Sequence, residues 1–342
     1  MKHFTKKTAS APAKGNTSIN TRRRDAALRV YALRLRISAR SFLSLVAVAT
    51  MGSLGWALFG PLSSIATITF ATALCLYAQE EGSRAQAKQV AHLEQTLRGY
   101  ADNIYFQAET LTTTYRMVDQ RFTLPPLRHW ALSPDAASAM TTLALSQQPK
   151  RILELGSGAS TILLASLLRM FGTGHLISIE HDPVFTERTK EHLAEAGLSH
   201  FAEVRYASLL PLPLSAATPS LDIAGEDDIA ELSRQGRHLL RTESQTENEQ
   251  ERIWYDLSAF TDISDIDLLV VDGPPHDTCT DARMPALSLL HHKLSPTAHI
   301  FLDDTGREDE QRMIKAWEDA FPDLVFTDLF TEKGNTLGRR EA

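Results

Sequence analysis

From Lys150 to the C-terminus, short apolar runs alternate with amphipathic segments. The apolar runs have the length of buried strands, and the segments between them have the spacing of helices. Strands are predicted at residues 151–155, 175–180, 201–206, 267–272 and 298–303, and helices at 161–171, 183–196, 283–293 and 308–321. This alternation is typical of a parallel sheet covered on both faces. Residues 324–330 and 335–339 are expected to close the sheet as an antiparallel hairpin.

A long apolar stretch precedes this region. Residues 41–79 contain no Asp, Glu, Lys, Arg or His, and one membrane crossing takes about 20 residues. Gly60-Pro61 favours a turn near the middle, so we expect membrane helices at 42–59 and 62–78 that form a hairpin. Arg34, Arg36 and Arg40 would hold the N-terminus inside under the positive-inside rule. A single crossing and a buried soluble hairpin are the alternatives, and the 40-residue basic lead-in disfavours a signal peptide.

Residues 80–122 are predicted to form one long helix, which Leu124-Pro125-Pro126 would end. Apolar residues recur every seven positions along it, at Val90, Leu97, Ile104, Leu111 and Val118. A second apolar line drifts as in an ordinary helix, so a dedicated coiled coil is only partly supported. Two interpretations stay open: the stripe packs on the following domain, or it pairs two chains into a homodimer.

Charge is distributed unevenly along the chain. Residues 1–40 carry eleven Lys and Arg against the single acid Asp25, whereas the whole chain has a net charge of −7, so the remainder carries −17. A basic tail on an acidic body does not indicate a nucleic-acid enzyme. Cys75 and Cys279 suggest neither a disulfide framework nor a cysteine metal site. The polar, acid-rich segment 208–250 is too long for an ordinary connection and is interpreted as a flexible insertion or a lid.

The run from Ile152 to Thr161 indicates a cofactor site. An apolar strand stops at Gly156-Ser157-Gly158, and a helical pattern follows at once. Glycines let a ligand approach the backbone closely, and the helix start supplies unpaired N–H groups. Glu180 ends the next strand, where a carboxylate can accept both hydroxyls of an adenosine ribose. An acid at a strand end can also be a simple helix cap, a role that His181-Asp182 would share.

The ligand at this turn is predicted to be cationic. The third glycine of a dinucleotide fingerprint is absent, and no tyrosine has a lysine four residues later, as short-chain dehydrogenases require. Glu154 lies two residues before the first glycine. A carboxylate there is favourable beside a cation and unfavourable beside a pyrophosphate.

These residues resemble the class I S-adenosylmethionine-dependent methyltransferases, and most closely the bacterial "methyltransferase domain" group that reads Leu-Glu-Leu-Gly-Ser-Gly-x-Ser-Thr. The resemblance covers about residues 130–340 and implies a Rossmann-like, seven-stranded α/β sheet with its last strand antiparallel. It also implies S-adenosylmethionine as cofactor. The cofactor-binding residues would be Glu154, Gly156, Ser157, Gly158, Ser160, Thr161, Glu180 and Asp272.

Acids at two further strand ends are candidates for the chemistry. Asp272 ends the fourth strand, and Asp303-Asp304 ends the fifth, where strand ends meet the ligand crevice. They resemble the divalent-metal site of catechol-type O-methyltransferases, which implies Mg²⁺ or another divalent cation, such as Ca²⁺, bound by these three carboxylates. Those enzymes have a lysine where this chain has Pro275.

His276, with Asp277, is the nearest substitute for a base, so Asp272 and His276 are the catalytic candidates. Alternatively, the three acids Asp272, Asp303 and Asp304 cap loops or form salt bridges with Arg283 or Arg307. Trp130 and the pair Trp254-Tyr255 would either flank the methyl acceptor or pack in the core.

The expected organisation is a basic, largely disordered cytosolic tail (1–40), a transmembrane hairpin (41–79), a helical stalk (80–122) and a methyltransferase domain (123–342). We expect a two-pass inner-membrane enzyme with its N-terminus and catalytic domain in the cytoplasm. Its acceptor would be an oxygen of a glycan or envelope-related small molecule, because a tethered enzyme is concentrated near membrane-borne substrates. The rivals are a catalytically silent membrane scaffold of the same fold and an NAD(P)-dependent oxidoreductase.

Overall fold

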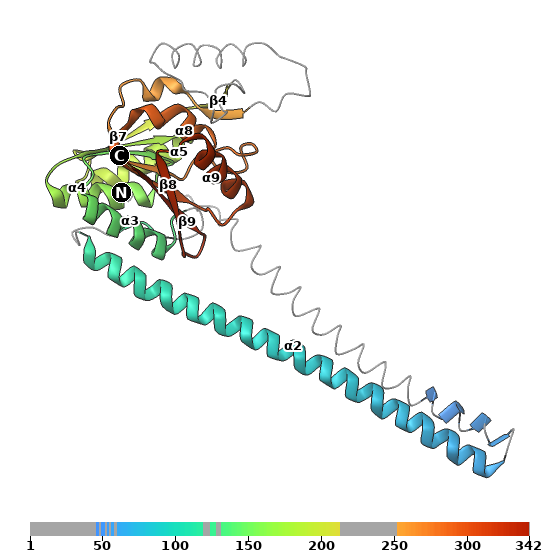
Figure 1. Cartoon of the computed structure of the whole chain (residues 1–342). Coiled ribbons are helices and arrows are strands. Elements are labelled where there is room, and N and C mark those ends of the chain that lie inside the picture. The colour runs from blue at the N-terminus through green and yellow to red at the C-terminus, as the bar shows by residue number, and fades with distance from the viewer. Residues whose placement is uncertain are drawn as a thin grey trace, which may run out of the picture. The chain divides into compact units, whose positions relative to one another are not determined.

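The computed structural model describes residues 60–118, 124–127, 131–212 and 252–341, together with scattered positions between 46 and 57. The chain divides into two units, Met1–Gly99 and Tyr100–Ala342, and Figure 1 draws both. The predicted basic tail, Trp130 and most of the insertion, residues 213–251, lie outside the described residues.

The unit Tyr100–Ala342 is built on a seven-stranded sheet in the order β3-β2-β1-β6-β7-β9-β8. Its strands are β1 (Arg151–Leu155), β2 (His175–Glu180), β3 (Ala202–Tyr206), β6 (Ile266–Val271), β7 (Leu294–Asp303), β8 (Leu324–Leu329) and β9 (Asn335–Arg340). The first five strands in sheet order run parallel, whereas β9 is antiparallel to both β7 and β8. The predicted seven-stranded α/β sheet with a terminal antiparallel hairpin is therefore confirmed.

Two apolar layers cover the sheet because its central strands are buried on both faces. Ile152 belongs to a cluster with residues of α3 (Pro134–Gln147), α4 (Ala159–Phe171) and α5 (Pro183–Glu195). Leu153 faces the other way, into a cluster with η1 (Leu257–Phe260), α8 (Pro285–Leu290) and α9 (Glu308–Ala320). Alternate residues of one strand therefore pack against opposite faces of the sheet. The sheet and the helices on its two faces form the three layers in Figure 1.

Several elements differ from the sequence-based expectation, and β7 begins at Leu294 rather than at the predicted residue 298. Helix α8 is shorter than the predicted 283–293, because its last turn tightens into the 3-10 helix η2 (His291–Lys293). Helix α3 was not predicted, since its Ala, Ser and Thr residues carry little periodicity. The two ends of the insertion also form a ribbon, β4 (Leu209–Leu212) paired antiparallel with β5 (Arg252–Tyr255).

Helix α2 spans Pro61–Met117 without interruption. Gly60 has φ +84°, so the predicted break at Gly60-Pro61 is present. The separate helices expected at 62–78 and 80–122 are one helix instead, and its end lies at Met117 rather than at 122. Among the described residues, no helix combines the length and apolar character that a membrane crossing needs.

The predicted apolar stripe of α2 is mostly exposed. Val90, Leu97 and Ile104 are 55–59% accessible, whereas Val118 is buried in the α3–α4 layer. In the unit Tyr100–Ala342, a polar line makes the contacts instead. Gln107 Oε1 accepts a hydrogen bond from the Asp135 backbone N–H at 3.1 Å, and Asn103 donates to Glu332 at 3.1 Å. The pairing of two stalks into a homodimer stays a prediction.

Candidate functional site

The turn after β1 lies close against the end of β6 and begins with a glycine in a conformation that other residues rarely adopt. Gly156 has φ +93°, and a Cβ added there would lie 3.3 Å from the backbone C and O of Asp272. Its N–H donates to the Ile179 carbonyl at 2.9 Å, which ties the turn to β2 as well. Gly158 has φ +157°, and a Cβ there would meet nothing within 4 Å. The turn is therefore packed at its first glycine and open at its second.

The Glu180 carboxylate holds this turn in place. Its Oε2 accepts from the backbone N–H and the hydroxyl of Ser157, at 2.9 and 2.8 Å. Its Oε1 accepts from the backbone N–H groups of His181 and Asp182, at 2.8 and 3.0 Å. Burial opposes ionisation, but the hydrogen bonds from His181, Asp182 and Ser157 outweigh it and lower the pKa of Glu180. Glu180 Oε1 also lies 3.0 Å from the His181 Nδ1, and this side-chain contact raises the pKa of the His181 imidazole.

Glu154 lies beneath the glycine turn and is fully buried. Its Oε2 accepts a hydrogen bond from the Thr161 hydroxyl at 2.5 Å, and the Thr161 oxygen in turn accepts from the Gly158 N–H at 2.9 Å. Its Oε1 has no hydrogen-bond partner among the described residues. Burial raises the pKa of Glu154 to about 7, although the hydrogen bond from Thr161 acts against this. Glu154 thus supports the start of α4, where Ser160 and Thr161 are also buried.

The three predicted acids of β6 and β7 come together. One carboxylate oxygen from each of Asp272, Asp303 and Asp304 lies within 4.8 Å of the others. Burial raises the pKa of Asp272 well above its usual value, and the charge of Asp303 adds to this. Burial and the charge of Asp304 likewise raise the pKa of Asp303. The Asp303 Oδ1 accepts from Asn335 at 2.7 Å, whereas no described residue hydrogen-bonds its buried Oδ2.

A buried arginine is the main counterion of this acidic cluster. The Arg283 side chain donates to the backbone carbonyls of Asp272 and Asp303, both at 2.8 Å. It also lies 3.3 Å from the Asp272 carboxylate and 3.5 Å from that of Asp304. Burial disfavours its charge, but the surrounding carboxylates raise the pKa of Arg283. Arg307 pairs with Asp304 at 2.9 Å, so both predicted salt bridges are present.

The remaining candidates occupy different surroundings. The His276 side chain is exposed and lines a cavity of about 10 Å³ with Arg283, Asp309 and Glu310. Trp254 and Tyr255 are buried in the core, which favours the packing interpretation of this pair. Sequence reasoning gave Arg283 only a minor role, because a lone arginine in a helical pattern carries no signal of burial.

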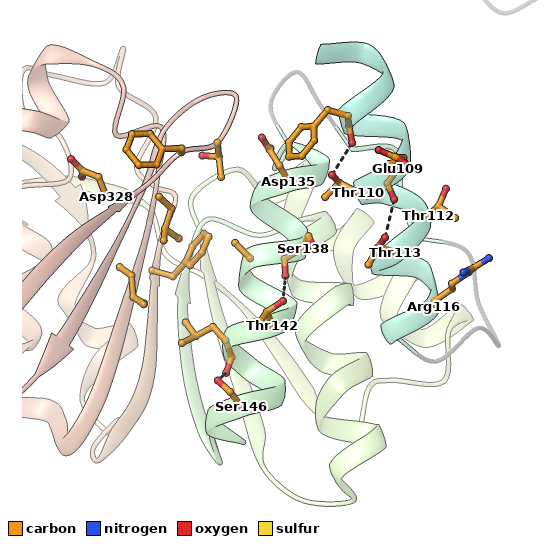
Figure 2. A pocket seen from close by; sticks show the side chains of 18 of the residues that line it. Glu109, Thr110, Thr112, Thr113, Arg116, Asp135, Ser138, Thr142, Ser146 and Asp328 are labelled. Atoms are coloured by element: carbon orange, nitrogen blue, oxygen red, sulfur yellow. Dashed lines mark hydrogen bonds between the residues drawn. The ribbon is translucent and has the colours of Figure 1, made fainter. Parts of the chain in front are cut away.

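Two surface grooves lie on the β7–β9–β8 half of the sheet. The larger, about 1360 Å³, lies between α2, α3 and the strands, and Figure 2 shows Ser138, Thr142 and Ser146 along its α3 side. None of the predicted site residues lines it. The smaller groove, about 650 Å³, reaches Asp304 and is also lined by Arg307 and Lys333.

Comparison with known proteins identifies the central part of this unit. Residues 153–305 match the model of the family described as "Methyltransferase domain". The match includes the glycine turn, Glu180 and all three acids, and it confirms the predicted enzyme class, an S-adenosylmethionine-dependent methyltransferase. No curated protein matches the chain.

Solved structures with similar chain traces include three methyltransferases. A putative O-methyltransferase from Klebsiella pneumoniae is 19% identical, with 71% of this chain and 97% of that chain covered and a TM-score of 0.40. The O-methyltransferase TomG from Streptomyces achromogenes is 20% identical, with coverages of 71% and 96% and a TM-score of 0.40. An O-methyltransferase from Bacillus cereus is 17% identical, with coverages of 70% and 97% and a TM-score of 0.41.

The raised pKa of Glu154 predicts a stability that depends on pH. Between pH 4.5 and about 7 the folded state keeps a proton that the unfolded state has released, so stability falls as pH rises through this window. At about 1.4 kcal/mol per pKa unit, the loss reaches about 3 kcal/mol. Glu154→Gln removes the titration, so this variant should be more stable than the wild type at pH 8 and nearly equal to it at pH 4.5.

Urea unfolding followed by tryptophan fluorescence measures this effect, since Trp254 and Trp317 are fully buried. Glu203→Gln is the matched control, because Glu203 lies exposed on β3 beside Arg205. Parallel pH profiles for Glu154→Gln and the wild type would contradict the assignment.

Proposed function

We propose that this methyltransferase transfers a methyl group to a hydroxyl oxygen of a small-molecule or glycan acceptor. One observation carries the proposal: the glycine turn and the acidic cluster are neighbours, since the backbone of Asp272 lies 3.3 Å from the Cβ position of Gly156. A donor held at the turn would therefore have carboxylates beside its reactive end. Oxygen acceptors must lose a proton on methylation, and carboxylates at this place suit that need.

The residues of the turn fit a donor of the size and charge of S-adenosylmethionine. Its sulfonium supplies the methyl group by in-line displacement, so positioning and desolvation are the main tasks of the protein. The open face of Gly158 allows close approach to the backbone, and Glu180 stands at the predicted place for the ribose hydroxyls. The Oε1 of buried Glu154 has no hydrogen-bond partner among the described residues, and a positively charged donor above it would favour the ionised form of this carboxyl group.

The smaller groove beside Asp304 is our proposed acceptor site. It opens at the C-terminal end of β7, where the acidic cluster lies. In this arrangement Asp272 accepts the hydroxyl proton. Because burial raises the pKa of Asp272, its charged form requires a higher pH than that of an ordinary aspartate. His276 is the second candidate base, supported by its nearness to Arg283.

A divalent cation at Asp272, Asp303 and Asp304 is part of the proposal. Three mutually close carboxylates with an unpaired, buried Asp303 Oδ2 suit Mg²⁺ or Ca²⁺, which prefer oxygen ligands. Such an ion would lower the pKa of a chelated acceptor hydroxyl. Arg283 already offsets part of the negative charge, so the competing role of the acids is to hold this arginine.

Donor binding is tested by two glycine variants at opposite ends of α4. Gly158 and Gly172 both have positive φ and open surroundings. An arginine at 158 would fill the donor's place, so Gly158→Arg should weaken S-adenosylmethionine binding more than about 100-fold. Gly172→Arg carries the same charge at the far end of the helix and should keep the wild-type affinity. Isothermal calorimetry measures both.

The same titrations separate the rival functions. An oxidoreductase would bind NADH in place of the methyl donor, and a scaffold would bind neither ligand. Equal affinity of the two arginine variants for S-adenosylmethionine would contradict the proposed donor site.

The cation is tested with Asp303→Asn. This change should weaken Mg²⁺ binding at least about tenfold, because it removes a charged ligand, and EDTA should abolish activity of the wild type. Asp265→Asn is the control, since Asp265 forms an exposed salt bridge with Arg151 at the opposite end of the strands. Full activity in EDTA would show that Arg283 alone neutralises the acids.

We also propose that residues 41–79 attach the enzyme to the inner membrane, with its catalytic domain in the cytoplasm. The support is the sequence alone, in which this stretch carries no charged residue. A membrane position would explain a glycan or envelope-related acceptor. The full chain should then sediment with membranes and resist alkaline carbonate extraction. Recovery in the carbonate supernatant would contradict the proposal.

A further inference from the structure

Tyr255 is the last residue of β5, and its hydroxyl lies at the centre of the strand ends that build the site. The hydroxyl oxygen would be only 2.2 Å from a Cβ added at Gly273, and the same Cβ would lie 3.2 Å from the backbone N of Gly156. Glycine at position 273 is therefore what gives the phenol room to reach the glycine turn. The aromatic ring itself is fixed by packing against Trp254 and Phe260.

This hydroxyl is buried without any hydrogen-bond partner among the described residues. Buried hydroxyl groups almost always have a partner, so an unpaired one requires an explanation. The charged groups that act on it are the carboxylates of Glu180, Asp272 and Glu154 and the guanidinium of Arg283. These are the groups that surround the proposed donor site, and Glu180 acts most strongly among them.

The acceptor positions of the Glu180 carboxylate are already occupied, so it cannot accept both ribose hydroxyls. A carboxylate offers about four acceptor positions, and Glu180 already accepts four hydrogen bonds, from the backbone N–H groups of Ser157, His181 and Asp182 and from the Ser157 hydroxyl. Its Oε1 also lies 3.0 Å from His181 Nδ1, a contact that raises the pKa of the imidazole and so favours a charged partner. The backbone donors are fixed and the imidazole is held by charge, whereas the neutral Ser157 hydroxyl can turn away. Glu180 can therefore accept one ribose hydroxyl by releasing Ser157, but the other hydroxyl of the ribose needs a different partner.

We propose that the Tyr255 hydroxyl is that partner and hydrogen-bonds one ribose hydroxyl of the methyl donor. The inference rests on the proposed donor site and adds a residue outside the glycine turn to it. A phenol both donates and accepts a hydrogen bond, so it can pair with a sugar hydroxyl in either direction. Tyr255 also ends the ribbon β4–β5, so donor binding would be coupled to the strand pair that brackets the insertion.

The test compares Tyr255→Phe with the wild type in the full chain. The variant removes only the oxygen, so its affinity for S-adenosylhomocysteine should fall about tenfold, which corresponds to about 1.4 kcal/mol. Without ligand, the melting temperature should stay equal or rise, because an unpaired buried hydroxyl has been removed. A purely structural residue would instead change the melting temperature and leave the affinity alone.

Deoxy analogues identify the contact. The 2′-deoxy and 3′-deoxy forms of S-adenosylhomocysteine each lack one ribose hydroxyl. For the analogue that lacks the hydroxyl bound by Tyr255, wild type and Tyr255→Phe should have the same affinity, whereas the tenfold difference should persist for the other analogue. Trp254→Phe is the matched control, since Trp254 lies next to it on β5 and its buried indole N–H is also unpaired. This control should bind like the wild type.

Each other result counts against the proposal. Affinities within twofold for Tyr255→Phe and the wild type would overturn it, as would a Tyr255→Phe protein that does not fold, because the hydroxyl would then have a structural partner. Failure of the wild type to bind S-adenosylhomocysteine at all would refute the proposed donor site instead.

Discussion

The close approach of two backbone segments is the constraint on which the site depends. The turn after β1 and the turn after β6 meet at Gly156 and Gly273. A side chain at Gly273 would overlap the Tyr255 hydroxyl, and one at Gly156 would crowd the Asp272 backbone in a strained conformation. Parallel strands bring their carboxyl ends to one edge of the sheet. Because Gly156 and Gly273 have no side chains, these strand ends lie close together. The glycine turn, the acidic cluster and the Tyr255 hydroxyl are therefore neighbours.

Electrostatics explains how this edge of the sheet accommodates several acids. Five acids converge there, namely Glu154, Glu180, Asp272, Asp303 and Asp304, and each would repel the others if all were charged and unpaired. The chain handles them in three ways. Glu180 is stabilised by N–H and O–H donors, Glu154 is kept close to neutral by burial, and the remaining three gather around Arg283. Glu154 Oε1 and Asp303 Oδ2 have no hydrogen-bond partner among the described residues, so a positively charged ligand beside them would favour the ionised forms of both groups.

The sequence predicted most of the sheet, and it predicted which candidate site residues lie together, because both depend on local signals. Apolar runs marked the strands, and the acids and glycines at strand ends marked the edge where the candidate residues meet. The sequence did not reveal the role of Tyr255, which depends on Gly273 some 18 positions away. The sequence also did not show that Arg283 is buried. The contacts of α2 were missed as well, because Gln107 and Asn103 make them through polar groups, which leave no apolar pattern. Burial and contacts between residues far apart in the sequence depend on tertiary packing, and the spacing of residue types along the chain does not predict them.

A crystal structure of the full chain with S-adenosylhomocysteine would show whether the donor binds at the glycine turn. We expect ligand density over the open face of Gly158, with a ribose hydroxyl in hydrogen-bond contact with Glu180 and the sulfur facing the Asp272 side of the turn. Ligand density at a place away from the β1–α4 turn, or an unchanged Glu180–Ser157 pair beside an empty turn at saturating ligand, would contradict this expectation.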